Sequence, residues 1–402
     1  RSVAPITFQN SEFEQTHATP DSINFGIGQP SPSLLPIEMI RSSLGGWEKE
    51  GLDPLVLQYG TSAGFLSFRK VLSSFLSGEY GYPVTEEELM ITCGNSQTID
   101  LASRLFLREG DEVVMEEPSY FLARTIFDTS HAKKVAIPMD ENGLMVSELE
   151  DKLEKGEIAP KLVYTIPNYQ NPTGSCLPEE RKKKLVELAH KFNFVILADE
   201  PYNLLHWREG LKPTPLVKYD KEGREGKGVA VSAGSFSKIL APGLRLGWIH
   251  AHPSLISKFG SHGIVRSGGG LNPFTSYSVQ NLIASGGLKS NINNLNSVFS
   301  KRCQTMLSTL AAHLPESCSF TSPGGGYFVW VTLPSFLLAS RVREVSKEKY
   351  GVVFMDGKLA CVADPPSLLN CLRLSFAFYN EKEIEVGVKS LCNAIEECIE
   401  KR

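Results

Sequence analysis

The sequence lacks the features that mark membrane and extracellular proteins. Its 402 residues contain no run of 18 apolar residues, which is about the length that a membrane-spanning helix requires. The eight cysteines are scattered, without a Cys-x-x-Cys pair or a histidine at zinc-ligand spacing, so neither a metal site nor a disulfide framework is predicted. We expect reduced thiols in a cytoplasmic protein, or in a mitochondrial one if a leader preceded Arg1.

The chain also lacks a strong excess of charge of either sign. It has 41 Lys and Arg against 45 Asp and Glu, a formal net charge of −4 and an isoelectric point near 6.1. The one basic run, residues 181–184, is typical of the solvated face of a helix. No nucleic-acid partner is therefore predicted.

Sequence motifs of several other protein classes are missing or incomplete. No Gly-x-Gly-x-x-Gly fingerprint opens a helix, and the glycine-rich segment 266–274 lacks the Gly-Lys-Ser/Thr ending of a phosphate-binding loop. We interpret that segment as a linker between domains or a loop near a subunit interface. Ser235-x-x-Lys238 matches the Ser-x-x-Lys of penicillin-binding proteins and class A β-lactamases, but no Lys-Thr-Gly follows.

The order of predicted elements favours an α/β fold. Short apolar segments typical of buried strands alternate with helical patterns such as residues 178–192. The predicted strands are 89–94, 112–116, 134–137, 161–166, 194–197 and 229–231. Such alternation is typical of a mostly parallel sheet flanked by helices. Before it, residues 1–45 show little helical periodicity, and 24–32 has the Gly and Pro punctuation of an extended arm.

The C-terminal part has a different pattern. A chain of this length is expected to form two or three domains of about 100–200 residues each. From about residue 290, the predicted helices are 298–313, 337–350 and 381–399, and the predicted strands are 326–333, 352–355 and 371–376. We therefore predict a large domain over 46–288 and a small α+β domain over 289–402, with 1–45 forming an N-terminal arm and part of the small domain.

The segment 232–247 carries the most specific chemical signal. Lys238 follows the predicted strand 229–231, and open α/β sheets place their ligands at such strand ends. Ser235 and Ser237 precede the lysine, and Arg245 follows it. Hydroxyls and a forked guanidinium can bind a phosphate, while a desolvated lysine can attack a carbonyl. A lysine that forms an imine beside a phosphate site is what pyridoxal 5′-phosphate (PLP) requires.

Polar residues also follow the neighbouring predicted strands. Asn171 lies in a turn after the strand that ends at residue 166, and Asp199 and Tyr202 follow the next strand. Gly94 ends a strand, and the helix after it begins with Asn95 and Ser96, whose free backbone N–H groups could bind an anion. Asp199 could instead be an ordinary helix cap, because aspartate is common at that position.

Two further side chains have alternative interpretations. Tyr120 could stack on a flat ring or pack in the core. Arg373 lies inside a predicted apolar strand, where a lone guanidinium is costly, so it should face a carboxylate of the protein or of a substrate.

Taken in order, these residues resemble the class I/II aminotransferases, the PLP-dependent enzymes of fold type I, over nearly the whole chain. The matching pieces are Tyr59 in the turn 58–64, the turn 94–97, Tyr120, 171–174, 199–202, 235–238, Arg245 and Arg373. The sequences of segments 58–64 and 168–174 are most similar to those of the aminoadipate and kynurenine aminotransferase branch. The resemblance implies transfer of an amino group between an α-amino acid and a 2-oxo acid.

The resemblance also implies a role for each matching residue. Lys238 would form the imine with PLP and carry a proton, while Asp199 would keep the pyridine nitrogen protonated. Asn171 and Tyr202 would bind the ring oxygen, and Tyr120 would stack on the ring. The phosphate would be held by Gly94, Asn95, Ser96, Ser235, Ser237 and Arg245, and by Tyr59 of the other subunit in a homodimer. Arg373 would bind the substrate carboxylate, with Gly28 closing over it and Asn171 nearby.

Two alternatives use the same fold. A PLP-dependent carbon–sulfur β-lyase would create the same carbanion and differ only in the leaving group at Cβ. A PLP-binding sensor domain of a transcription regulator would use the site for binding alone.

Overall fold

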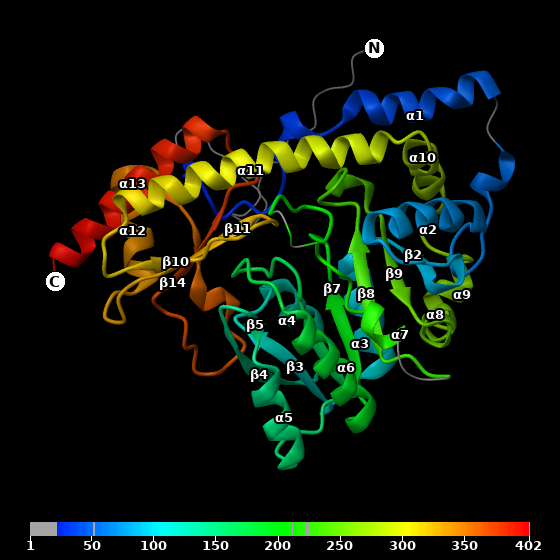
Figure 1. Ribbon diagram of the computed structural model, residues 1–402, viewed down its shortest axis with the longest axis horizontal. Coiled ribbons are helices and arrows are strands. Elements are labelled where there is room, and N and C mark those ends of the chain that lie inside the picture. The colour runs from blue at the N-terminus through cyan, green and yellow to red at the C-terminus, as the bar shows by residue number, and fades with distance from the viewer. Residues whose placement is uncertain (1–21, 51–52, 209, 211, 222–225, 402) are drawn as a thin grey trace.

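The chain is built around an eight-stranded sheet whose five central strands run parallel. The computed structural model describes residues 22–50, 53–208, 210, 212–221 and 226–401 (Figure 1). The strand order is β2-β9-β8-β7-β6-β3-β4-β5. Its strands are β2 (Leu89–Thr92), β3 (Glu112–Glu117), β4 (Lys133–Asp140), β5 (Gly143–Leu144), β6 (Leu162–Thr165), β7 (Val195–Asp199), β8 (Ala230–Ser235) and β9 (Gly247–Ala251). Strands β4, β3, β6, β7 and β8 are parallel, which confirms the mostly parallel sheet.

Helices cover both faces of this sheet, because its central strands are apolar on both sides. One face packs on α3 (Asn95–Phe106), α4 (Phe121–Asp128), α8 (Pro253–Gly260) and α9 (Gly263–Gly268). The other face packs on α5 (Val146–Glu154), α6 (Glu179–Phe192) and the short α7 (Lys218–Lys221). Alternate residues of one strand serve the two cores: Val113 and Met115 face the first set, and Val114 faces the second.

A smaller antiparallel sheet forms most of the C-terminal part. Its order is β10-β11-β14-β13, with β10 (Ser319–Phe320), β11 (Phe328–Thr332), β13 (Met355–Asp356) and β14 (Cys371–Ser375). Its helices are α11 (Gly287–His313), α12 (Ala339–Tyr350) and α13 (Glu381–Glu400). The long α11 runs from beside α10 (Pro273–Ala284) to α13 and so connects the two parts of the molecule (Figure 1).

The N-terminal arm joins the C-terminal part by a pair of short parallel strands. Strand β1 (Ile23–Asn24) pairs with β12 (Val352–Val353). The prediction of an extended arm is therefore right for its first described residues. The separate expectation of little helical structure over residues 1–45 is wrong at its C-terminal end, where α1 (Ile37–Glu50) begins. α2 (Leu66–Tyr80) then follows a turn, as predicted. The remaining short helices are 3-10 turns at Pro32–Leu34, Pro54–Leu57, Glu86–Glu88, Pro242–Leu244 and Gly357–Ala360.

The division into an arm over 1–45, a large domain over 46–288 and a small domain over 289–402 stays a prediction; its boundaries lie in helices α1 and α11. One other expectation needs correction. The interpretation of 266–274 as an interdomain linker is wrong, because α9 and α10 occupy most of it. Gly269 and Gly270 in the turn between them pack so closely on Gly60 and Thr61 that a Cβ would lie 2.7 and 2.2 Å from the carbonyl oxygens of those two residues.

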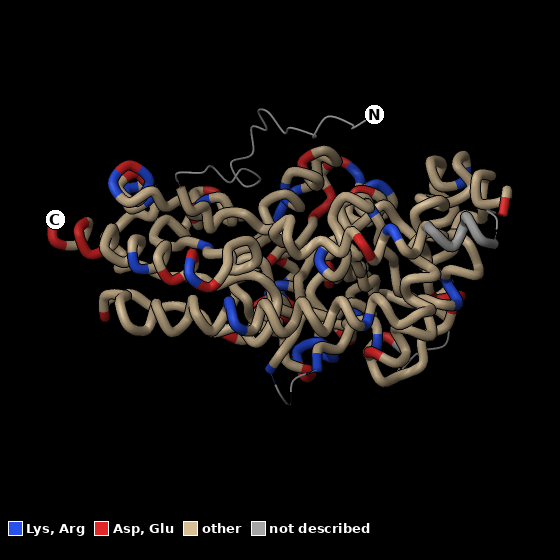
Figure 2. Tube along the Cα trace, turned by 90° about the horizontal axis from the view of Figure 1, so that it is seen from above, with Lys and Arg blue, Asp and Glu red and all other residues tan. Residues whose placement is uncertain are grey.

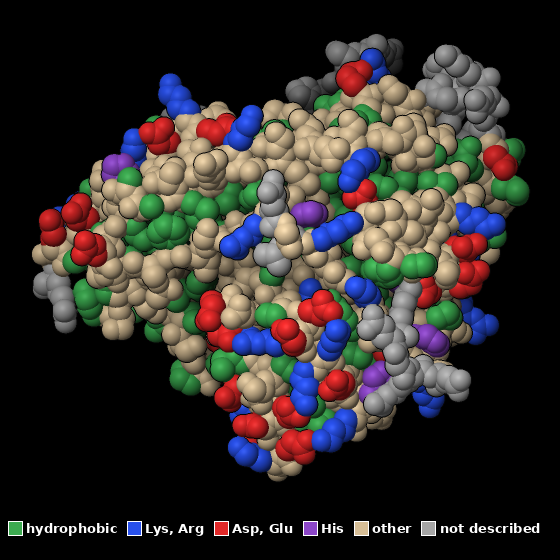
Figure 3. Space-filling model, in the orientation of Figure 1, with side chains coloured by type: hydrophobic (Ala, Val, Ile, Leu, Met, Phe, Trp, Pro, Cys, Tyr) green, Lys and Arg blue, Asp and Glu red, His purple; other side chains and the backbone are tan. Residues whose placement is uncertain are grey.

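Charged side chains are mixed rather than gathered by sign. Lys and Arg are interspersed with Asp and Glu along the trace (Figure 2), and both signs cover the face formed by α5 and α6 (Figure 3). Lys184 of α6 pairs with Glu150 of α5 at 2.7 Å. None of the described helices is both long and apolar enough to cross a membrane.

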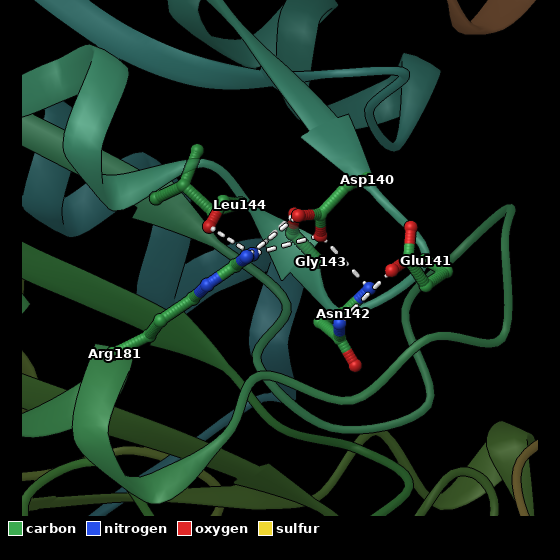
Figure 4. Close-up of polar contacts among 6 residues, drawn as sticks. All are labelled: Asp140, Glu141, Asn142, Gly143, Leu144 and Arg181. Atoms are coloured by element: carbon green, nitrogen blue, oxygen red, sulfur yellow. Dashed lines mark hydrogen bonds and ion pairs between the residues drawn. The ribbon is translucent and has the colours of Figure 1, made fainter.

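The basic run 181–184 is only partly a solvated face. Arg181 reaches from α6 to the β4–β5 turn, where Nη1 and Nη2 donate to the two oxygens of Asp140 at 2.8 and 2.6 Å (Figure 4). Nη1 also donates to the carbonyl of Leu144 at 3.1 Å. Lys182 is buried and its Nζ donates to Asn168 Oδ1 at 2.7 Å. These two side chains therefore tie α6 to neighbouring loops instead of facing solvent.

Candidate active site

A cavity of about 230 Å³ lies at the carboxyl edge of the large sheet, against β11 and β14 of the small one. The parallel register brings the ends of β6, β7 and β8 side by side, with Asp199 opposite Ala233. Twelve residues predicted for the site line the cavity: Gly28, Asn95, Ser96, Tyr120, Asn171, Asp199, Tyr202, Ser235, Ser237, Lys238, Arg245 and Arg373. Gln29, Ile99, Ile166, Pro201, Pro242 and Phe328 complete the lining.

Lys238 occupies the position expected of a reactive lysine. It lies three residues after β8, and its Nζ donates a hydrogen bond to the carbonyl oxygen of Gly28 at 2.8 Å. Burial and the positive charges of Arg373 and Arg245 lower its pKa to about 8, although the negative charge of Asp199 opposes the shift. A lysine with this pKa gives up its proton close to neutral pH, as a nucleophile or general base must.

Asp199 is a buried carboxylate held by two neutral donors. Asn95 Nδ2 donates to Oδ1 at 2.6 Å and the Tyr164 hydroxyl donates to Oδ2 at 2.8 Å. Burial raises the pKa of Asp199, while those two hydrogen bonds and the charge of Lys238 oppose the shift. Because it is the last residue of β7 and no helix begins there, the alternative of an ordinary helix cap is wrong.

Asn95 has a different contact from the one expected. The resemblance implied a role at the phosphate, but its side-chain amide is turned toward Asp199 and also donates to the carbonyl of Ala233 at 2.9 Å. The physical reason is that a buried carboxylate needs donors, and Asn95 starts α3 directly across from the end of β7. Gln97 of the same turn accepts from the Cys93 backbone N–H at 2.7 Å. Ser96 is exposed and lines the cavity.

The remaining predicted phosphate ligands also meet at the cavity. Ser235 Oγ accepts from the Ser237 backbone N–H at 3.1 Å, which leaves the Ser235 hydroxyl proton available to a further acceptor. Arg245 has a positive φ of 46° and packs its guanidinium over Gly94. Gly94 itself has φ +89°, and a Cβ there would lie 3.3 Å from Arg245 Nη2. A glycine is therefore required both by the turn and by the neighbouring cation.

Arg373 is a buried guanidinium with neutral hydrogen-bond partners. Nη1 donates to Asn171 Oδ1 and Nη2 to the Gly26 carbonyl, both at 2.9 Å, and the group lies 4.2 Å from the centre of the Phe328 ring. Burial lowers its pKa to about 10. Among the described residues its hydrogen-bond partners are neutral, and its Nε has no hydrogen-bond partner. The alternative of a carboxylate within the protein therefore finds no support in the described part of the chain.

Aromatic rings pack around the polar groups. Tyr202 lies 5.4 Å from the Tyr327 ring and 6.0 Å from the Phe328 ring, measured between ring centres. The Tyr327 hydroxyl donates to the carbonyl of Lys238 at 3.2 Å. Tyr120 lines the cavity, and burial raises its pKa to about 12, so it is a neutral phenol. It lines the cavity and also packs against the core beneath α3 and α4 and on Phe121.

Two residues predicted for the site do not line this cavity: Gly94, which packs against Arg245, and Tyr59. The side chain of Tyr59 is 81% exposed, and it lies in the turn that packs on Gly269. The sequence prediction placed it at the site of another subunit.

Sequence reasoning missed three residues that shape the site. Tyr164 bonds to Asp199, Phe328 packs under Arg373, and Tyr327 bonds to the lysine segment. A signal for Tyr164 was present, since a tyrosine inside a strand buried on both faces needs a partner for its hydroxyl. Its partner could not be inferred, because it comes from the neighbouring strand.

Comparison with known proteins gives a family. A family model described as aminotransferase class I and II matches residues 20–391. The chain belongs to the class I and II aminotransferases. An aromatic-amino-acid aminotransferase of Thermococcus litoralis is 36% identical over 391 residues, which is 95% of this chain and 90% of that protein.

Solved structures give the same answer. The kynurenine aminotransferase of Pyrococcus horikoshii is 34% identical with a TM-score of 0.86, covering 94% of this aminotransferase and 92% of that chain. A multiple substrate aminotransferase from Thermococcus profundus is 32% identical with a TM-score of 0.88, covering 98% and 97%. The fold is therefore fold type I, and the enzyme is a PLP-dependent aminotransferase; the β-lyase and sensor alternatives are not favoured.

The residues around the cavity fit PLP. A carboxylate, a lysine with a lowered pKa, and a set of hydroxyl and guanidinium donors lie around one cavity, matching a pyridine nitrogen, an aldehyde and a phosphate. Two buried polar atoms, Asn95 Oδ1 and Arg373 Nε, have no partner among the described residues. Buried polar atoms in proteins normally have hydrogen-bond partners. These two atoms of the aminotransferase are therefore available for hydrogen bonds to bound groups.

The Gly94 geometry gives a test of the phosphate side of this site. We expect Gly94→Ala to weaken PLP binding by about tenfold or more, because the new methyl group displaces the Arg245 guanidinium. Gly110→Ala is a matched control, since Gly110 has φ +85° and nothing within 4 Å of its would-be Cβ. Both variants carry the strain of a positive φ, which costs about 1–2 kcal/mol of stability. Equal PLP dissociation constants in the two variants, measured by cofactor absorbance after dialysis, would contradict the proximity argument.

Proposed function

We propose that Lys238 is the covalent attachment site of PLP and the base of the reaction. When bound, PLP supplies an electron-withdrawing ring that stabilises negative charge at the substrate Cα. Support comes from the lowered pKa of Lys238 and from its position in the cavity between Asp199 and Arg373. The Lys238 amine would remove the proton from the substrate Cα and hold it for return. Its bond to the Gly28 carbonyl keeps Nζ pointed into the cavity before substrate arrives.

The proposal gives Asp199 the role of holding a proton on the pyridine nitrogen. A positive charge beside a buried carboxylate favours the ionised form and offsets the burial that raises the pKa of Asp199. Asn95 and Tyr164 would stabilise that ionised form by donating to both oxygens. Asn171 and Tyr202 would bind the ring oxygen, and Tyr120 would stack on the ring. Gly94, Ser96, Ser235, Ser237 and Arg245 would hold the phosphate.

Arg373 is proposed to bind the substrate α-carboxylate. A buried guanidinium whose partners are all neutral carries an uncompensated charge, which is costly unless an anion binds. The fork of Arg373 matches a carboxylate, and Gly28 leaves space beside it, since even a Cβ there would lie 3.7 Å from Nη2. Substrate binding would thus place the Cα proton near Lys238 and exclude water from a cavity lined by Tyr120 and Phe328.

We further propose that the preferred substrates have neutral aromatic side chains. The cations among the described lining residues are Lys238, Arg245 and Arg373, and the roles above use all of them. None is left for a second carboxylate, whereas Tyr120, Ile99, Ile166 and Phe328 offer apolar surface. The relatives named for aromatic amino acids and kynurenine agree with this preference.

The attachment site can be tested chemically. Borohydride reduction of the PLP-loaded enzyme, followed by peptide mapping, should place the pyridoxyl group on Lys238. Lys238→Ala should still bind PLP but lose at least about 100-fold in turnover, because no base remains to move the proton. Lys182→Ala is a matched control, as Lys182 is also a buried lysine and lies outside the cavity. Labelling of any other lysine would refute the assignment.

The substrate proposal can be tested with a panel of amino acids. Phenylalanine, tyrosine and kynurenine should convert the bound cofactor at least about tenfold more efficiently, in kcat/KM, than aspartate or α-aminoadipate, because an acidic side chain would be buried without a cation. The change in cofactor absorbance measures each half-reaction. A preference for the acidic amino acids would show that a cation outside the described lining completes the site.

We also propose a homodimer with a shared site. Tyr59 is 81% exposed, and the apolar side chains of Leu55 and Leu57, close to it in sequence, are 66% and 69% exposed. Exposed apolar surface is typical of association surfaces. The proposed two-fold dimer would bring Tyr59 of one subunit to the phosphate side of the other subunit's cavity, as the sequence prediction requires.

Mixing two impaired variants tests the shared site. Tyr59→Ala and Lys238→Ala should each have little activity, but after subunit exchange a heterodimer has one site with both residues intact. Random exchange gives about one half heterodimers, so about one quarter of the wild-type activity should return. Exchange is confirmed by mass spectrometry. If activity stays at the level of the two parents, Tyr59 and Lys238 do not serve one site from different subunits.

The compartment proposed for the enzyme is the cytoplasm. Support comes from its eight cysteines, all of which are free thiols, as is usual in a reducing environment.

A further inference from the structure

Glu116 is a buried carboxylate that the mechanism above does not use. It is the penultimate residue of β3, is 1% exposed and does not line the cavity. Its Oε1 accepts from the Thr165 hydroxyl at 2.5 Å, and its Oε2 accepts from the Ile166 backbone N–H at 3.2 Å and from Gln170 Nε2 at 3.0 Å. All three donors lie on the segment that leads from β6 to Asn171.

Gln170 connects Glu116 to the turn that carries Asn171 through hydrogen bonds. Its Nε2 also donates to the Pro118 carbonyl at 2.9 Å, which ties it to the exit of β3. Its Oε1 accepts from both the backbone N–H and the hydroxyl of Thr173, each at 2.9 Å, and its carbonyl accepts from the Gly174 N–H at 2.7 Å. The side chain of Gln170 thus closes a ring of hydrogen bonds around Asn171.

Asn171 in turn orients the substrate-binding guanidinium. Its Oδ1 accepts from Arg373 Nη1 at 2.9 Å, and the other terminal nitrogen of Arg373 is fixed by Gly26. A continuous series of contacts therefore runs from the Glu116 carboxylate through Gln170 and the Asn171 turn to Arg373.

We propose that Glu116 is a positioning residue for substrate binding: acting through Gln170, it holds Asn171 where Asn171 aims the Arg373 guanidinium at the substrate carboxylate. This inference rests on the proposed role of Arg373. It explains why a carboxylate is present at a site where burial disfavours charge, since Thr165, Ile166 and Gln170 all present donors and only an acceptor with two oxygens satisfies them.

The free-energy cost of burying the Glu116 carboxylate supports a specific role for this residue. Burial raises the pKa of Glu116, the three hydrogen bonds oppose the rise and the negative charge of Asp199 adds to it, so that the pKa is about 7. Glu116→Gln keeps the size of the side chain but turns one acceptor into an NH₂ donor, so at least one buried donor loses its partner. The Asn171 turn would then lose its anchor while the Arg373 guanidinium remains.

The test compares binding of 3-phenylpropionate with binding of its uncharged amide, 3-phenylpropanamide, to the PLP-loaded enzyme. Neither compound has an amino group to react, so the ratio of the two dissociation constants reports the contact between the carboxylate and Arg373. We expect Glu116→Gln to reduce the preference for the carboxylate about tenfold and to raise KM for amino acids by a similar factor, with kcat changed much less.

Gln170→Ala tests the proposed route. It should reduce the same preference, and the double variant should lose no more than Gln170→Ala alone, because both changes break one series of contacts. Glu112→Gln is the matched control on the same strand: its carboxylate bonds to Lys133 and Ala159, away from the cavity, and its loss should leave the preference unchanged. Cofactor absorbance and thermal unfolding verify that each variant is folded and loaded.

The outcomes distinguish the positioning role of Glu116 from the substrate-binding role of Arg373. If Arg373→Lys lowers the preference for the carboxylate but Glu116→Gln and Gln170→Ala do not, the positioning role is overturned and the role of Arg373 stands. If Arg373→Lys leaves the preference at the wild-type value, the proposed role of Arg373 fails and the positioning role with it. Additive losses in the double variant would overturn the route through Gln170. If Glu116→Gln does not fold, Gln170→Ala alone decides, and an unchanged preference overturns the proposal.

Discussion

The buried guanidinium of Arg373 links three parts of the chain that are distant in sequence. It lies on β14 of the small sheet, donates to Asn171 beside the large sheet and donates to Gly26 in the N-terminal arm. Because these acceptors are neutral, the charge is oriented but not neutralised. The positions of the small sheet, the arm and the Asn171 turn relative to one another are therefore set by their contacts with one cation. This arrangement forms the wall of the cavity that faces the substrate.

Burial also acts on three of the ionisable groups that line the cavity. It lowers the pKa values of Lys238 and Arg373 and raises that of Asp199, so each group is pushed toward its neutral form. PLP and an amino acid bring complementary charges to this site. Removing these groups from water on folding costs the aminotransferase free energy, and the binding of charged ligands offsets that cost.

Contacts across the strand ends also distinguish residues that face the ligands from those that support them. Asp199, Lys238 and Arg373 line the cavity, whereas Tyr164 and Glu116 bond to cavity residues or to the segment that carries one. Asn95 does both, since it lines the cavity and donates to Asp199. The sequence predicted the first group at the site. It also predicted Asn95 at the phosphate, whereas the side-chain amide of Asn95 donates to Asp199, a neighbour that the position of an asparagine at a helix start does not specify.

The sequence by itself determined the α/β class, the position of Lys238 after a buried strand and the set of polar residues at the strand ends. It could do so because apolar periodicity and strand-end chemistry are local properties of the chain. Only the tertiary structure decided that Gly247–Ala251 inserts antiparallel between β2 and β8, that a helix follows the N-terminal arm and that Arg373 contacts Asn171 rather than a carboxylate of the described chain. Those outcomes depend on which segments become neighbours, and the free energy of burying a polar group is set by its neighbours in space, which no local pattern specifies.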